Sequence, residues 1–147
     1  MPRMQQRSRA EAIVFVCERS GSGDPDRAWE LISRPQEWSR WAPHVRGAWG
    51  LGDGEVRLGA RGYARLLGLV PIPATITAVD PGRSWTWLVG PVEMVHRVDP
   101  TAEGCTVAVE ISAPAPIEAA LRIGYRPLVD RLLSRLLSES SRPLVVG

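Results

Sequence analysis

The stretch "DPDRAWELISRPQEWSRWAP", residues 24–43, contains the signals that decide the fold. Asp24 is a natural N-cap and Pro25 a natural first helical residue, so we expect a short helix to begin here. Pro35 ends this helix, because a proline disfavours helical geometry in the residue before it. Residues 35–41 predict one or two further helical turns, with the acidic Glu37 in the first turn, where the helix dipole favours a negative charge. Two short helices joined by a bend are therefore expected, and the first buries one face: Ala28, Leu31 and Ile32.

Strand patterns flank this pair of helices. The β-branched and aromatic residues of 12–17 predict a first strand. From residue 44 onward the pattern changes to period two, and glycine and proline turn signals divide it into roughly six strand-length segments. These signals fall at 52–54, 67–68, 80–83, 90–91 and 99–104. An antiparallel meander is expected, which gives seven strands when the first is included.

The C-terminal part predicts a long amphipathic helix that follows Pro116. Apolar residues recur at helical spacing along it: Leu121, Tyr125, Leu128, Leu132 and Leu136. Pro127 cannot donate a hydrogen bond to the carbonyl of Ile123, so the helix is expected to bend near Gly124.

Composition excludes several function classes. The 147 residues are 44% apolar, which is normal for one globular domain with a core. The net charge of +2, with acids spread among the 18 arginines, gives no field for binding nucleic acid. The N-terminal apolar run "AIVFVC" is too short for a signal peptide or membrane span, which predicts a cytoplasmic protein without integral membrane association.

Motifs for metal, cofactor and nucleophilic chemistry are missing from the sequence. Only two histidines occur, without HxH, HExxH or a Cys/His cluster, so we expect no metal site. The "GSG" of residues 21–23 lacks the lysine of a phosphate loop, and no GxSxG elbow is present. We therefore predict no cofactor.

Three stretches carry a resemblance to a known superfamily. "DRAWELISRPQEWSRWAPHV" is similar to the helix-bend-helix opening of the polyketide cyclase/dehydrase-like group of the SRPBCC superfamily. "VDPGRSWTW" resembles the fourth turn and fifth strand of that group, and "YRPLVDRLLSRL" resembles its closing helix. The superfamily also includes the START lipid-transfer domains and the birch-pollen-allergen-like proteins.

The resemblance implies an α+β helix-grip fold. In this fold a seven-stranded antiparallel sheet wraps around a long C-terminal helix, with two short helices between strands 1 and 2. The likeness covers residues 11–138, which are expected to form a single domain. Residues 1–10 and 139–147 are expected to be flexible termini.

The same resemblance implies a hydrophobic cavity between sheet and helix, closed at one end by the two short helices. Trp38 and Trp41 would plug that end as core residues. The expected ligand-binding residues come from the sheet and the long helix: Trp49, Ile76, Trp85, Trp87, Met94, His96, Leu121, Tyr125 and Leu128.

Trp85 and Trp87 alternate on one strand and therefore face the same side of the sheet. If this side is concave, both are cavity or core residues, which is the preferred interpretation. If it is convex, they form an exposed apolar patch that needs a partner.

His96 and Tyr125 are the candidates for catalysis. His96 is expected to face inward, because it shares a face of its strand with Met94 and Val98. The opposite face carries the charged residues Glu93 and Arg97. It is either a satisfied core group or a group that hydrogen-bonds a carbonyl or phenolic oxygen of a ligand and acts as acid or base. Tyr125 lies beside the predicted bend, where its hydroxyl either enters the pocket or reaches solvent at the rim.

Arg57, Arg61 and Arg65 recur along the predicted third strand, so alternation places all three on one face. The solvent face is expected, because burial of three unpaired guanidiniums would cost too much. A bulge at Gly59 or Gly62 would instead bring one of them to the cavity mouth, where it could bind an acidic ligand group.

Cys17 and Cys105 are expected to be reduced and partly buried. In the helix-grip fold the first and last strands pair antiparallel, so a disulfide between them is geometrically conceivable. A reducing cytoplasm argues against it.

Three functions follow as hypotheses. The first is binding of a hydrophobic small molecule, a lipid, polyketide or aromatic compound, by a monomer or homodimer. The second is a polyketide cyclase or dehydratase that uses the same cavity, with His96 or Tyr125 moving protons. The third is a protein-interaction module whose pocket has collapsed and whose surface binds another protein; exposure of Trp85 and Trp87 would favour it.

Overall fold

The structure, a computed structural model, describes residues 12–41, 48–51, 54–65 and 71–141. Within them the strands form one antiparallel sheet in the order β1-β7-β6-β5-β4-β3-β2. The strands are β1 (Ala12–Gly21), β2 (Ala48–Trp49), β3 (Arg61–Arg65), β4 (Pro71–Asp80), β5 (Ser84–Val89), β6 (Val92–Pro100) and β7 (Cys105–Pro114). The helices are α2 (Pro25–Ser33), the 3-10 helix η1 (Pro35–Arg40), α3 (Ala115–Gly124) and α4 (Arg126–Ser140).

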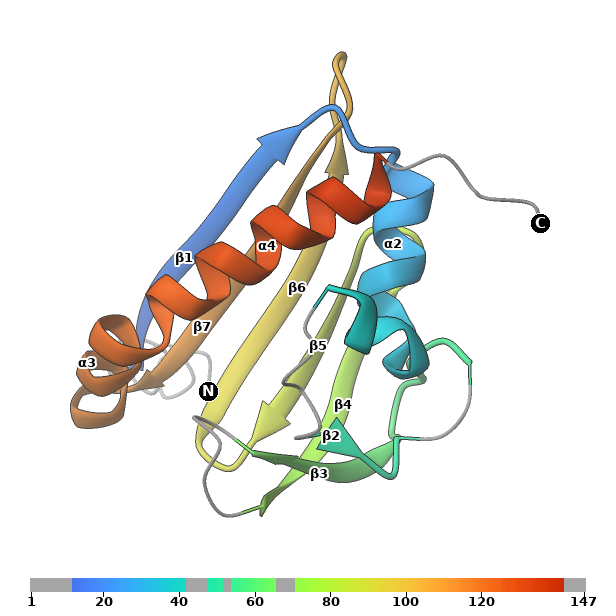
Figure 1. Ribbon diagram of the computed structural model, residues 1–147. Helices are drawn as coiled ribbons and strands as arrows, with labels where there is room; N and C mark the ends of the chain where they lie inside the picture. Colours follow the sequence, from blue (N-terminus) through green and yellow to red (C-terminus); the bar gives the residue numbers. More distant parts are fainter. Residues whose placement is uncertain (1–11, 42–47, 52–53, 66–70, 142–147) are drawn as a thin grey trace, which may run out of the picture.

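Helix α4 lies along one face of the sheet, with α2 near one end and α3 at the other (Figure 1). Side chains that alternate along the strands point to this face and are buried there. In β6 the buried side chains are Val92, Met94, His96 and Val98, and in β1 they include Phe15 and Cys17. The predicted α+β helix-grip fold is confirmed, and the core lies between the sheet and α4.

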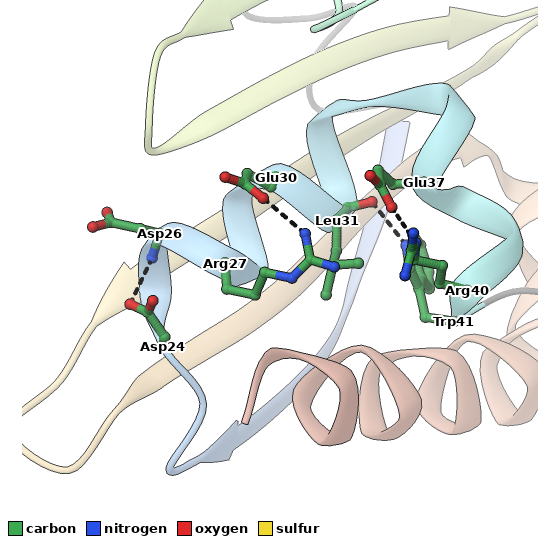
Figure 2. Close-up of polar contacts among 8 residues, drawn as sticks. All are labelled: Asp24, Asp26, Arg27, Glu30, Leu31, Glu37, Arg40 and Trp41. Carbon is green, nitrogen blue, oxygen red and sulfur yellow. Dashed lines mark hydrogen bonds and ion pairs between the residues drawn. The ribbon is translucent and has the colours of Figure 1, made fainter. Parts of the chain in front are cut away.

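The opening helices begin and end where the sequence predicts. Asp24 caps α2 by accepting a hydrogen bond from the backbone N–H of Asp26 at 3.2 Å, and Pro25 is the first helical residue (Figure 2). Ala28, Leu31 and Ile32 are fully buried. Pro35 follows the last residues of α2 and is the first residue of η1.

The C-terminal helix differs from the prediction, because the chain divides into α3 and α4 at Tyr125 instead of forming one bent helix. Pro127 lies in the first turn of α4, where its missing N–H needs no helical acceptor. The predicted site of the irregularity is therefore correct, but the irregularity is a break between two helices.

Helix α4 extends two residues past the predicted domain end at 138, and Ser140 is buried against the start of α2. The carbonyl of Ser140 accepts a hydrogen bond from the Asp24 N–H at 3.2 Å. A Cβ atom at Gly23 would lie only 1.9 Å from Ser140 Oγ, so this close approach requires glycine. Residues 1–10, predicted to be flexible, lie outside the described residues, as do 142–147.

The predicted third strand is shorter than expected. A turn around Gly59, which has a φ of +85°, precedes β3, so Arg57 lies before the strand and not on it. Arg57 and Arg61 are exposed, as predicted, while the side chain of Arg65 is outside the described residues. The irregularity in strand pairing lies between Ile76 and Ala78, and not at either predicted glycine.

The possible disulfide between Cys17 and Cys105 is excluded by the register of β1 and β7. Cys17 pairs with Val109, whereas Cys105 pairs with Gly21. The offset of four residues separates the two cysteines by about 13 Å along the strands, far beyond the reach of a disulfide. Both thiols are free and buried.

Candidate functional site

A small cavity of about 70 Å³ lies between the sheet and α4. Its walls come from η1 and the residue that follows it, from β5 and β6, from the junction between α3 and α4, and from the middle of α4. The lining residues are Trp38, Trp41, Trp85, Trp87, His96, Tyr125 and Leu132. Aromatic rings dominate this set, and it contains no arginine, aspartate or glutamate.

Four of these rings form one packed cluster. Trp85 and His96 face each other across β5 and β6, and their rings stack at 3.8 Å with an angle of 9° between planes. Trp38 lies nearly parallel to Trp85 at 5.8 Å. Trp87 meets Trp38, Trp85 and His96 edge-on at 5.7, 5.4 and 5.8 Å. Offset-stacked and edge-on rings are the favoured arrangements, so the wall is well packed.

The tryptophans also satisfy the carbonyl groups that α2 leaves free at its C-terminus. Trp41 Nε1 donates to the Leu31 carbonyl at 2.8 Å (Figure 2). Trp38 Nε1 and Trp85 Nε1 both donate to the Ile32 carbonyl, at 3.0 and 3.1 Å. The last carbonyls of a helix have no intrahelical donor and need such partners when buried. Indole rings meet this need and fill the core together, which explains why tryptophans crowd this turn.

The Leu31 carbonyl depends on Trp41 in particular, because the residue four positions later is Pro35, which has no N–H. We expect Trp41→Phe to lower the free energy of unfolding by about 1–3 kcal/mol more than the loss of ring area alone, since a buried acceptor is left unpaired. Trp38→Phe is the matched control, because the Ile32 carbonyl keeps the donor of Trp85. Urea unfolding of both variants checks this, and equal losses would contradict it.

His96 is held as a neutral imidazole. Its Nδ1 lies 3.4 Å from the carbonyl oxygen of Trp85, and burial lowers its pKa from 6.5 to about 3, despite the opposing effect of that backbone hydrogen bond. A carbonyl only accepts, so Nδ1 carries the proton and donates. The lone pair therefore belongs to Nε2.

The hydroxyl of Tyr125 stays protonated at neutral pH. Burial, together with the nearby Cys17 thiol, raises its pKa to about 12. The pKa of Cys17 is itself raised to about 11, chiefly by burial and then by the negative charge of Asp130. Near neutral pH both the Tyr125 hydroxyl and the Cys17 thiol therefore stay protonated, and neither is in the anionic form that a nucleophile or base requires.

A family model described as "Polyketide cyclase / dehydrase and lipid transport" matches residues 19–140. The chain belongs to this family. The resemblance inferred from the sequence is therefore confirmed. None of the curated proteins matches the sequence significantly.

Solved structures share the fold of this polyketide cyclase/dehydrase family member at low identity. A Mesorhizobium loti protein is 18% identical with a TM-score of 0.67, over 86% of this chain and 96% of the other. A Bacillus halodurans protein is 13% identical with a TM-score of 0.67, over 85% and 96%. DynU16, from the dynemicin biosynthetic locus, is 20% identical with a TM-score of 0.62, over 90% of this chain and 50% of the other.

The polyketide cyclase/dehydrase fold brings together only part of the predicted site. Trp85, Trp87, His96 and Tyr125 line the cavity, and the two tryptophans face the interior with 1% and 7% exposure. The other predicted residues do not line it: Ile76, Met94 and Leu121 are fully buried core residues, and Leu128 is a partly buried one. Alternation identifies the buried face of a strand, but the sizes of neighbouring side chains decide where space remains. The side chain of Trp49 is outside the described residues.

Three residues of the cavity wall were not among the ligand-binding residues predicted from the sequence of this family member. Trp38 and Trp41 were expected as core residues and are buried in the core, but they also line the cavity. Leu132, expected only as part of the helical stripe, lines it too. The crowding of tryptophans in residues 35–43 was the signal for the first two. Leu132 lies one heptad after Tyr125, on the same face of the helix, and that spacing could have identified it.

The described residues offer neither a metal site nor a membrane-spanning helix. No group of three histidine, cysteine or acidic side chains in them could hold a metal ion. The described helices of this polyketide cyclase/dehydrase family member include none with the length and apolar character of a membrane span.

Proposed function

We propose that this polyketide cyclase/dehydrase family member binds a small apolar ring compound in the cavity between β5, β6 and α4. The observation that carries the proposal is the cavity wall, whose described residues have aromatic and aliphatic side chains without a formal charge. Small-molecule sites typically combine such walls with a few polar groups that orient the ligand. His96 and Tyr125 supply those groups here.

Binding is favoured over catalysis by the protonation of these two residues. General acid–base catalysis works best when the pKa of the catalytic group lies near the operating pH. The pKa of His96 is about 3 and that of Tyr125 about 12, so each keeps one protonation state around neutrality. The cyclase or dehydratase alternative lacks a proton carrier among the described residues of the wall.

The protein-interaction alternative lacks the observation that would favour it, because Trp85 and Trp87 are both buried. The size of the cavity limits the ligand instead. About 70 Å³ is well below the roughly 300–1,000 Å³ of sites for drug-sized ligands. A single ring, or one end of a longer molecule, is the occupant that fits.

Titration with toluene tests the proposal, with the indole N–H signals of the tryptophans followed by heteronuclear NMR. We expect shifts for Trp38, Trp41, Trp85 and Trp87, and none for Trp29, which does not line the cavity. Leu132→Trp should fill much of the space and weaken binding at least about tenfold. Leu58→Trp, at an exposed turn position, is the matched control. Unchanged signals, or equal affinity of the two variants, would refute the proposal.

A further inference from the structure

The polar atoms of the cavity wall are arranged in a way that selects among ring compounds. We propose that the cavity prefers neutral rings that carry a hydroxyl group, and that this hydroxyl donates a hydrogen bond to His96 Nε2. The inference rests on the proposed binding function and adds the chemical class of the ligand. It follows from the orientation of the His96 ring, from the unpaired polar groups of the wall, and from the charge of the wall.

The contacts of the His96 ring distinguish its two nitrogens. Nδ1 faces the Trp85 carbonyl, and the ring stacks flat on the indole of the same residue at 3.8 Å. Neutral imidazole has one N–H donor and one acceptor nitrogen, and the hydrogen bond of one nitrogen determines the role of the other. The wall therefore presents Nε2 as a fixed acceptor.

Within the described residues no hydrogen bond is formed to this acceptor, since the one contact of the His96 ring with a polar atom is made by Nδ1. The same wall holds an unpaired donor, because the indole N–H of Trp87 is buried without a hydrogen-bond partner there. A buried polar group without a partner costs about 1–3 kcal/mol, so a ligand that supplies the missing partners gains affinity. Tyr125, whose hydroxyl can donate, lines the same cavity.

A hydroxyl group matches this set of atoms, since it can donate to Nε2 and accept from a donor in the wall. A ketone or ether oxygen only accepts, and would leave Nε2 unpaired. A carboxylate or ammonium group would lose its hydration without gaining an opposite charge from the described residues of the wall, none of which carries one. A neutral hydroxylated ring is therefore preferred over ketones, ethers and ions.

Three probes of similar size test the inference on the unmodified protein: phenol, toluene and anisole. We expect phenol to bind about tenfold more tightly than toluene, because only phenol can donate a hydrogen bond to Nε2. Anisole has the oxygen without the proton and should resemble toluene. Equal affinity for phenol and toluene would overturn the inference while leaving the proposed function intact. Failure of every probe to bind would overturn both.

His96→Phe provides the matched variant, since it keeps an aromatic ring and removes Nε2. The ratio of phenol to toluene affinity should fall from about ten to about one. A second measurement covers the case in which this variant does not fold. In the unmodified protein, the ¹⁵N signal of Nε2 should shift on addition of phenol and not of toluene. A signal that phenol leaves unchanged, or a lone pair found on Nδ1, would contradict the inference.

Discussion

Replacement of Trp85 by alanine is expected to lower the free energy of unfolding by about 3–5 kcal/mol. Trp85 is 1% exposed, and its ring packs against Trp38, Trp87 and His96. Truncation would remove this apolar contact area and leave a cavity that the surrounding rings cannot fill without losing their own contacts. Chemical unfolding followed by far-UV circular dichroism measures the loss directly.

Trp85→Phe separates packing from hydrogen bonding at the same position. The Ile32 carbonyl keeps its bond to Trp38 Nε1, so this variant should lose about 1–2 kcal/mol, well below the alanine variant. Trp29→Ala is a second control, since Trp29 is only partly buried and packs at the edge of the core. A loss below about 1 kcal/mol for Trp85→Ala would show that the aromatic cluster does not hold the sheet and the opening helices together.

The aromatic cluster links stability to the proposed function. Its indole N–H groups fasten the C-terminus of α2, while its ring faces line the cavity. The same side chains thus fix the position of the short helices and the shape of the site. A pocket with walls that are held in this way is largely pre-formed, which limits the ordering cost when a ring compound enters.

Local signals explain how much of the fold could be predicted from the sequence. Asp24, Pro25 and Pro35 act on their immediate neighbours, so the start of α2 and the bend after it were predictable. Period-two patterns identified the buried face of β5 and β6 for the same reason. Pro127 was ambiguous, because the residue is compatible with a kink inside a helix and with the first turn of a new one.

The candidate site was less predictable, because its decisive contacts join distant parts of the chain. The bond from Trp85 Nε1 to the Ile32 carbonyl spans 53 positions, and no periodic pattern reports it. The tautomer of His96 depends on one backbone carbonyl of the neighbouring strand. The cavity volume is a small difference between the space that the backbone encloses and the volume that the side chains fill, and the sequence pattern does not report it. Ile76 and Met94 were therefore predicted on the correct face of the sheet, but they do not line the cavity.

Acidification is expected to destabilise the protein through His96. Its pKa is about 3 in the folded protein, because burial disfavours the charged imidazole, and 6.5 is the ordinary value for an unfolded chain. Between these two values the unfolded state binds more protons than the folded state, so stability falls as pH decreases. The contribution is fully present above about pH 6.5 and is lost progressively toward about pH 3.

The expected loss for this single group is about 2 kcal/mol between pH 7 and pH 5, a range in which most carboxylates stay ionised. Urea unfolding across that range measures it, with His96→Phe as the matched variant. The unmodified protein should lose stability with a slope that approaches about 1.4 kcal/mol per pH unit, whereas the variant should stay nearly flat. Parallel curves would mean that His96 takes up a proton as easily in the folded protein as in water. The fixed acceptor on Nε2, and with it the preference for hydroxylated rings, would then lose its structural basis.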